Sequence, residues 1–354
     1  MKILHVDTGK EWRGGQRQAL FLHNGLKAHG HDSKLICNPD GELIKRAENT
    51  FPLKFKSEID PFYIYKLNKI IKDFKPDVVH SHDSHSLTPC IAVAKLNKSF
   101  KLVHTRRVDF PLKKKLFNKY RSKSVTLVAI SKAIKDIISE SGIEPNRIEI
   151  IYSGSNKPEA VNTKIASELR EKFNPDGKFV VGTIANFADH KDYPTLLKAF
   201  DNLYEKNKDI VLMAVGDGPL FDEISAMRNS LKSKDNIIFT NFCSNIPEIL
   251  ANMDVFTMTS KTEGLCTSII DAMNASLPSV VTRAGGMPEV VSENETGLLY
   301  DVGDYKALAD GYLTLFEDKE LYKKMSANAL KHAYLFSAEK MVLSYIDLYR
   351  KLIK

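Results

Sequence analysis

Cysteine is scarce in this chain of 354 residues: there are four, and none stands in a Cys-x-x-Cys pair. Cys37, Cys90, Cys243 and Cys266 are widely spaced along the sequence. Such spacing argues against a disulfide framework, which small extracellular proteins need, and favours reduced thiols. We therefore expect a cytoplasmic protein without disulfide bonds.

Long hydrophobic runs are absent as well. No apolar stretch approaches the ~20 residues that a membrane-spanning helix needs. Residues 1–7 are too few and too polar for a signal peptide, and they predict a first strand instead. A hydrophobic content of 43% and a charged content of 27% are typical of a globular protein, and the length of 354 residues indicates two domains.

Positive charge exceeds negative charge only moderately, with a formal net charge of +7. This balance suits anionic small ligands, an anionic membrane surface or nucleic acid and does not decide between them. Residues 111–123 interleave cations with Leu112, Leu116, Phe117 and Tyr120. The stretch predicts either a solvated helix face or a basic amphipathic helix at the inner face of an anionic membrane. No aromatic stacking platform accompanies it, so we expect no nucleic-acid partner.

The usual ligands of a divalent cation are also missing. No Asp-x-Asp pair occurs, so an ion that bridges a diphosphate has no obvious ligands and we expect no metal. His80, His82 and His85 resemble the His-x-His pattern of zinc hydrolases, but Asp83 stands one place early and no further ligands are evident. We interpret these histidines as packing at a strand end or as acceptor contacts.

Short β-rich apolar runs alternate with segments of helical period along the whole chain. This alternation predicts βαβ units on parallel sheets, and the polar stretch 153–158 predicts a hinge between two of them. The fold class is therefore α/β, with two Rossmann-like doubly wound domains. We place them at residues 1–155 and 156–335, and we expect the helix within 336–354 to pack back across the domains. Strands are predicted at 2–6, 32–37, 78–80, 101–104, 126–129, 148–152, 179–184, 210–215, 237–240, 255–259 and 279–282.

Polar and glycine-rich loops follow many of these strands. Ligands of open parallel sheets bind at the carboxyl ends of the strands, so these loops are the candidate site. If the two domains face each other through those ends, all six loops line one cleft. The loops are Gly14-Gly15, 80–82, 104–107, 186–191, 216–218 and 263–268.

The most informative loop runs from Thr262 to Met273. Glu263 stands ahead of a glycine, a short apolar helix follows, and Asp271 lies eight positions after Glu263. A helix N-terminus gathers unpaired N–H groups and partial positive charge, which suits a phosphate. Carboxylates accept hydrogen bonds from hydroxyls. An anion site between two acids therefore predicts a ligand with both phosphate and hydroxyls, such as a nucleotide-sugar.

The ordered series of segments resembles the retaining glycosyltransferases of family 4, which have the GT-B architecture of two Rossmann-like domains facing across a cleft. The likeness covers nearly the whole chain and is strongest in the second half. The segments that carry it are Gly14-Gly15, 77–82, 151–154, 239–260, 263–273 and 285–291.

The resemblance implies a role for each matched residue. Three residues are implied to be catalytic: Glu263 contacts hydroxyls of the donor sugar, Lys191 is directed at the diphosphate, and His104 approaches the sugar ring. Asp271 takes the place of the acid that binds the ribose. The other implied donor-binding residues are Gly14, Gly15, Asn186, Gly216, Gly264, Leu265, Cys266 and Thr267.

Two positions depart from the family pattern. Asp271 is one methylene shorter than the glutamate that relatives carry there, and Asn186 replaces an arginine that partners the lysine. The loss of that arginine removes one positive charge from the leaving-group site. Arg106, Arg107 or His190 are the alternatives for supplying it.

Together these features predict a retaining, metal-independent hexosyltransferase. Its donor is a nucleoside diphosphate sugar, of the UDP type in most of the family, and it needs no other cofactor. The expected acceptor is a lipopolysaccharide core or another lipid-linked glycan. Two alternatives remain open at this point: a nucleotide-sugar epimerase on the same fold, and a non-catalytic nucleotide-sugar-binding protein.

Overall fold

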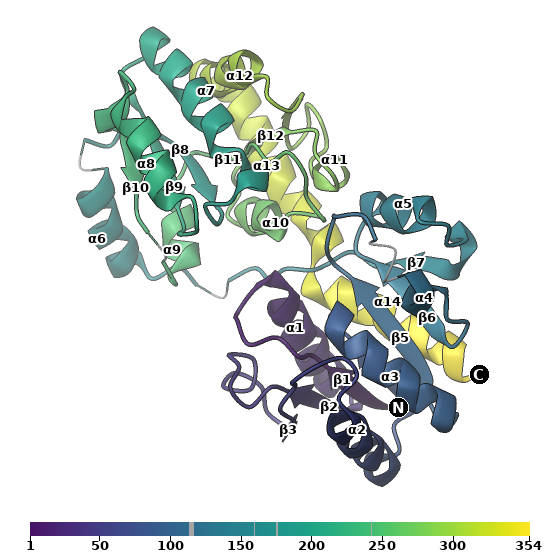
Figure 1. The fold of residues 1–354 in the computed structure, drawn as a ribbon. Helices are drawn as coiled ribbons and strands as arrows, with labels where there is room; N and C mark the ends of the chain where they lie inside the picture. The colour runs from purple at the N-terminus through teal and green to yellow at the C-terminus, as the bar shows by residue number, and fades with distance from the viewer. Residues whose placement is uncertain (113–116, 159, 175, 242) are drawn as a thin grey trace. The chain divides into compact units, whose positions relative to one another are not determined.

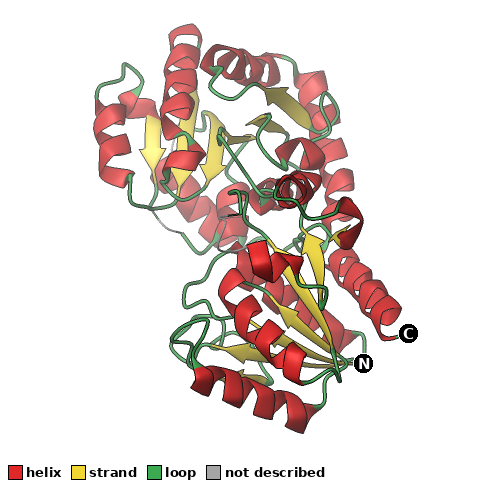
Figure 2. Cartoon of the chain, turned by 45° about the vertical axis from the view of Figure 1, so that its right-hand side comes forward, coloured by secondary structure: helices red, strands yellow, loops and turns green. Residues whose placement is uncertain are grey.

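The computed structural model describes residues 1–112, 117–158, 160–174, 176–241 and 243–354 (Figure 1). The chain divides into two compact units. The first unit contains Met1–Gly154 together with Ser337–Lys354, and the second contains Ser155–Phe336. Each unit has its own parallel sheet, and in Figure 2 helices flank the strands of both sheets. No helix in the described ranges combines the length and the apolar character needed to cross a membrane.

The sheet of the first unit has the strand order β3-β2-β1-β4-β5-β6-β7, and neighbouring strands pair in parallel. Its central strands are buried almost throughout, which explains why they appear in the sequence as continuous apolar runs rather than alternating patterns. The strands are β1 (Lys2–Val6), β2 (Asp32–Cys37), β3 (Thr50–Pro52), β4 (Val78–Ser81), β5 (Lys101–Arg106), β6 (Val125–Ala129) and β7 (Ile148–Ile150).

Helices cover the first sheet on its two faces, because right-handed crossovers that run in opposite directions place their helices on opposite sides. The C-terminal helix α14 packs against α1, and its Tyr345 and Val342 share a hydrophobic core with Leu22 and Ile3 (Figure 1). On the other face α2 and α3 pack together. The helices are α1 (Gly14–Ala28), α2 (Pro61–Phe74), α3 (Ser84–Leu96), α4 (Phe117–Arg121), α5 (Lys132–Glu140) and α14 (Ala338–Ile353).

The sheet of the second unit has the order β10-β9-β8-β11-β12-β13, again with parallel pairs. Phe187, Phe200 and Tyr312 are fully buried in its core, where α7 (Tyr193–Lys206) packs against α12 (Tyr305–Glu317). The strands are β8 (Phe179–Ile184), β9 (Ile210–Val215), β10 (Ile237–Phe239), β11 (Val255–Met258), β12 (Ser279–Thr282) and β13 (Gly297–Tyr300). The other helices are α6 (Thr163–Phe173), α8 (Phe221–Asn229), α9 (Ile246–Leu250), α10 (Thr267–Asn274), α11 (Met287–Val290) and α13 (Lys319–Ala333).

Both sheets therefore follow the doubly wound order of nucleotide-binding folds, which confirms the predicted fold class. In such a sheet the strand order reverses at one point, and ligands bind outside the carboxyl ends of the two strands that meet there. That point lies between β1 and β4 in the first unit and between β8 and β11 in the second. The residues that follow β8 and β11 are those that the sequence marks most strongly.

Candidate functional site

The loops after β8 and β11 are joined by hydrogen bonds at the reversal point of the second sheet. The Thr259 hydroxyl donates to the carbonyl oxygens of Lys191 and Asp192, at 3.1 and 3.2 Å. The backbone N–H of Lys261 donates to the carbonyl of His190 at 2.8 Å. Asp192 has a positive φ of 51° and ends the 3₁₀ turn that carries Lys191. These bonds fix the position from which Lys191 extends.

Lys191 and Glu263 form an ion pair across this point, although 72 positions separate them in the sequence. Their side chains are only 13% and 10% exposed. The Ser260 hydroxyl also donates to Glu263 Oε1, at 2.7 Å. Charges removed from water need such partners, because an isolated buried carboxylate or ammonium is strongly unfavourable. The structure thus places together the two residues expected to contact the sugar and the diphosphate.

The N-terminus of α10 lies directly after Glu263. Cys266, the residue before the helix, has a positive φ of 67° and turns the chain into it. Leu265 and Cys266 bury their side chains, while Gly264 and Thr267 are partly exposed. Burial raises the pKa of the Cys266 thiol to about 12, so the thiol stays protonated at neutral pH. What this loop offers to a ligand is its backbone N–H groups, which suits a phosphate.

Two glycines after β12 pack closely against the backbone of the Glu263 loop. Gly285 has a positive φ of 52°, and a Cβ added there would lie 1.9 Å from the Glu263 carbonyl oxygen. At Gly286 a Cβ would lie 2.4 Å from the Gly264 carbonyl oxygen, and the Gly286 N–H donates to the Glu263 carbonyl at 3.1 Å. Only glycine permits this close approach of two backbones.

The loops after β9 and β10 complete the same edge. Gly216 has a φ of 146°, and a Cβ there would lie 1.9 Å from the Ala185 carbonyl oxygen, next to the exposed Asn186. The Gly216 N–H donates to the carbonyl of Asn241 at 3.1 Å. Asn186, Gly216 and Lys191 therefore share one edge of the sheet. Phe242, which follows Asn241, lies outside the described residues.

Asp271 is partly exposed on α10, one turn after Thr267. Its Oδ1 accepts a hydrogen bond from the hydroxyl of Ser155, the first residue of the second unit. Sequence reasoning did not identify Ser155 or the Ser260 contact to Glu263. The available signal was weak: each is a serine that follows a strand and lies close to a marked loop.

In the first unit the predicted site residues have different surroundings. His104 on β5 is 1% exposed, and its two ring nitrogens lie 3.1 Å from the Ser81 hydroxyl and 3.1 Å from the Tyr120 hydroxyl. Both nitrogens therefore already have partners inside the unit. Gly14 and Gly15 begin α1. A Cβ at Gly14 would meet nothing within 4 Å, and one at Gly15 would lie 3.9 Å from Arg107 Cδ.

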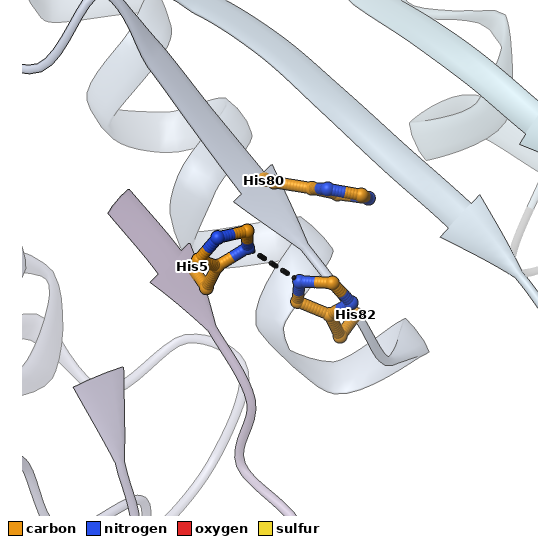
Figure 3. A group of neighbouring side chains, drawn as sticks. All are labelled: His5, His80 and His82. Atoms are coloured by element: carbon orange, nitrogen blue, oxygen red, sulfur yellow. Dashed lines mark hydrogen bonds between the residues drawn. The ribbon is translucent and has the colours of Figure 1, made fainter. Parts of the chain in front are cut away.

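Histidines gather around the reversal point of the first sheet (Figure 3). Within the described ranges, His5, His80 and His82 are the group of metal-ligating side chains close enough together to hold an ion. Their hydrogen bonds favour another interpretation. The two nitrogens of His80 lie 2.6 and 2.7 Å from the hydroxyls of Tyr349 and Thr105.

The hydrogen bond from Arg107 determines which ring nitrogens of His82 and His5 carry a proton. A guanidinium group only donates, so His82 Nδ1, 3.3 Å from Arg107 Nη2, accepts. The remaining ring proton of His82 is then on Nε2, which donates to His5 Nδ1 at 2.8 Å. His5 in turn carries its proton on Nε2. His5 and His82 are thus neutral rings joined by one hydrogen bond, and His5 Nε2 has no partner among the described residues. The guanidinium charge of Arg107 beside them disfavours a cation.

Burial lowers the pKa of His5, His80 and His82 well below the usual value, and it lowers the pKa of His104 to about 3. Unfolded histidines bind protons below about pH 6.5 whereas these four stay neutral, so folding stability falls as the pH drops through that value. Asp7 acts in the opposite direction, because burial raises its pKa to about 6. The four histidines together contribute more to the pH dependence of stability than Asp7 does.

We therefore expect the free energy of unfolding of the first unit to be about 4–5 kcal/mol lower at pH 5.5 than at pH 7.5. Urea titrations followed by fluorescence measure this unit selectively, because the single tryptophan is Trp12. A His5→Phe variant serves as the control: it removes one titrating group and should lessen the pH dependence. Equal urea midpoints at both pH values would contradict the assignment of neutral buried rings.

Two family models together match most of the chain. The model of glycosyl transferases group 1 matches residues 165–332, and the model of glycosyltransferase family 4 matches residues 12–156. The first of these ranges contains the Lys191, Gly216, Glu263 and Gly285 loops that the geometry brings together in the second unit. The chain belongs to the group 1 glycosyltransferases of the family 4 type.

Curated relatives align with most of this chain. N-acetyl-alpha-D-glucosaminyl L-malate synthase of Bacillus anthracis is 26% identical over 300 residues, which are 82% of this chain and 78% of the relative. The lipopolysaccharide core biosynthesis glycosyltransferase LpsD of Rhizobium meliloti is 25% identical and covers 99% of this chain and 98% of its own. Their names refer to L-malate in one relative and to the lipopolysaccharide core in the other.

The fold of this glycosyltransferase is shared with solved structures. HepE of Anabaena, in complex with UDP and glucose, superimposes with a TM-score of 0.87 over 99% of this chain and 100% of its own, at 18% sequence identity. The close superposition at low identity shows that the GT-B fold tolerates extensive sequence change.

Proposed function

We propose that this glycosyltransferase transfers a hexose-type sugar from a nucleoside diphosphate donor to an acceptor hydroxyl, with retention at the anomeric carbon. The observation that carries the proposal is the Lys191–Glu263 ion pair, which lies beside the N-terminus of α10 at the reversal point of the second sheet. A cation and helix N–H groups attract a diphosphate, and the neighbouring carboxylate accepts hydrogen bonds from sugar hydroxyls.

In this proposal the donor replaces the internal ion pair with its own contacts. Lys191 turns to the diphosphate and, with the N–H groups of Gly264–Thr267, stabilises the charge that develops on the leaving group. Glu263 is released to orient the sugar. None of the proposed site residues is a carboxylate assigned to the opposite face of the sugar ring, so we favour a front-face substitution in which the departing phosphate accepts the acceptor's proton.

Further donor contacts are proposed at the same edge of the second sheet and, in the first unit, at the start of α1. Asn186, Gly216 and Asp271 border it, and Asp271 is proposed to bind the ribose. Gly14 and Gly15 leave room for a phosphate to approach the backbone of the first unit. The ring nitrogens of His104 are bonded to the hydroxyls of Ser81 and Tyr120. We therefore propose that His104 holds these neighbouring side chains in place and does not itself contact the sugar. A lysine rather than a carboxylate pair at the diphosphate position favours a metal-independent reaction.

A panel of nucleotide-sugars tests the proposal directly. Thermal shift and calorimetry would identify the donor among UDP-, GDP- and ADP-sugars, and UDP is favoured because HepE was solved with UDP. Mass spectrometry of the products formed with lipid extracts or small hydroxy acids then identifies the acceptor. Conversion of the donor with no acceptor present indicates an epimerase instead. Binding without any turnover indicates a non-catalytic protein.

For the acceptor we propose a lipopolysaccharide core or another lipid-linked glycan, reached by a protein at the inner face of the membrane. The expected basic segment 111–123 lies partly outside the described residues. A different surface supports the proposal. Ile59, Phe62 and Tyr65 are 79%, 75% and 68% exposed, and Lys66 and Lys69 lie on the same face of α2.

Hydrogen bonds connect this surface to the end of the basic segment. Lys119 Nζ lies 3.1 Å from the carboxylate of Glu58, next to Ile59, and donates to the carbonyl of Ser84 at 2.6 Å. Exposed aromatic side chains interleaved with lysines are typical of helices that bind an anionic lipid surface. The malate synthase relative has a small acceptor in its name, and the exposed α2 face favours the lipid-linked alternative over it.

We expect the double variant Phe62→Ser/Tyr65→Ser to lose at least about tenfold in binding to phosphatidylglycerol vesicles, because two large apolar side chains no longer enter the bilayer. Vesicle co-sedimentation measures the effect, with phosphatidylcholine as the uncharged comparison. The matched control is Tyr334→Ser/Leu335→Ser, which removes two exposed apolar side chains of the second unit. Equal binding by both double variants would contradict an α2 docking surface.

A further inference from the structure

Ser155 is held by both its backbone and its side chain. It is 1% exposed, its N–H donates to the carbonyl of Phe336 at 2.9 Å, and its hydroxyl donates to Asp271 Oδ1. Phe336 is the last residue of the second unit and Ser155 is the first. The buried backbone therefore fixes the position of the hydroxyl, which donates to a carboxylate on α10.

The Asp271 carboxylate has a particular need for such a donor. It is partly exposed, and it replaces a glutamate expected from the family resemblance with a side chain one methylene shorter. A short acid reaches a given ribose only in a narrow range of side-chain orientations, and an exposed carboxylate rotates freely unless a neighbour holds it. A carboxylate has about four lone-pair sites, so one carboxylate can accept from a serine and from ribose hydroxyls at the same time.

We infer that Ser155 is a positioning residue for nucleotide recognition, which orients the Asp271 carboxylate toward the ribose hydroxyls of the donor. The inference rests on the proposed function, because it assumes that Asp271 faces a ribose. It adds Ser155 to the residues that determine nucleotide specificity. In this inference the enzyme distinguishes ribose from deoxyribose through a serine that does not touch the nucleotide. The principle is that of a supporting hydrogen bond that fixes a ligand-binding side chain.

A purely structural role for the same bond predicts a different result. If Ser155 only tied α10 to the start of the second unit, its loss would weaken all nucleotide binding equally. If it orients Asp271, its loss weakens the contact with the ribose hydroxyls and little else. Comparison of UDP with 2′-deoxy-UDP and 3′-deoxy-UDP separates the two, because each probe lacks one hydroxyl and keeps the diphosphate and the base.

Calorimetry on the full-length protein provides the test. We expect the wild type to bind UDP about tenfold more tightly than at least one deoxy nucleotide, and Ser155→Ala to reduce that ratio to about twofold. Ser155→Thr, which keeps the hydroxyl, should restore most of the ratio. Asp271→Asn should lose discrimination as Ser155→Ala does, and the double variant should lose no more than either single variant.

Ser153→Ala is the matched control, since Ser153 is similarly buried at 2% exposure and lies in the first unit. It should leave the ratio unchanged. A wild-type ratio that persists in Ser155→Ala while Asp271→Asn abolishes it overturns the inference and leaves the proposed function intact. Failure of UDP and of every other nucleotide to bind the wild type overturns the proposed function itself.

Discussion

Glu263→Gln is expected to lower kcat/KM for sugar transfer by at least about 10³-fold while the protein remains folded. In the proposed reaction this carboxylate accepts hydrogen bonds from the donor sugar. An amide of the same shape accepts them more weakly and also presents an N–H₂ group to the hydroxyls. Charge-assisted hydrogen bonds are roughly twice as strong as neutral ones, and their loss at the reacting sugar acts on the transition state.

The same substitution tests the ion pair. Without its carboxylate partner the Lys191 ammonium is left 13% exposed with the amide oxygen of the substituted side chain as acceptor, so we expect a modest loss of stability of about 1–2 kcal/mol. Steady-state kinetics with the identified donor and thermal denaturation measure the two effects. Glu293→Gln is the matched control, because Glu293 also pairs with a cation in the second unit, at 41% exposure. Full activity in the Glu263 variant would remove this residue from the mechanism.

Much of the fold follows from local patterns in the sequence. The long buried strands appear as apolar runs separated by helical segments, and the parallel order follows from that alternation. Two strands were missed for a physical reason. β3 has three residues and ends in Pro52, and β13 has four residues and begins at Gly297, so neither has the length or the composition that marks a strand. Both are edge strands of their sheets, so each pairs with a neighbouring strand on one side only.

The sequence predicts which residues lie at the candidate site better than it predicts which contacts they make. Loops after adjacent parallel strands must meet, which is why Lys191 and Glu263 were expected at one edge. Their direct pairing depends on residues with positive φ, Asp192 and Cys266, whose left-handed backbone no side-chain pattern reveals. The surroundings of His104 were equally hidden, because burial of a histidine is decided by partners such as Tyr120 that lie on another element.

Gly285→Ala is expected to lower the free energy of unfolding of the second unit by more than about 3 kcal/mol and to abolish donor binding. The left-handed backbone alone costs about 1 kcal/mol for alanine. The larger part comes from the methyl group, which would lie 1.9 Å from the carbonyl oxygen of Glu263. The contact is with backbone, so relief requires movement of the loop that carries the catalytic acid.

Gly303→Ala separates these two contributions. Gly303 also has a positive φ, 85°, and is exposed like Gly285, but a Cβ there would meet nothing within 4 Å. It should therefore show only the backbone cost, about 1 kcal/mol, with donor binding unchanged. Chemical denaturation and UDP titration of both variants measure the difference. Equal losses in the two would mean that the glycine at 285 is required only for its backbone angles. A selective loss at 285 would mean that close contact between the two loops holds Glu263 in place for the donor sugar.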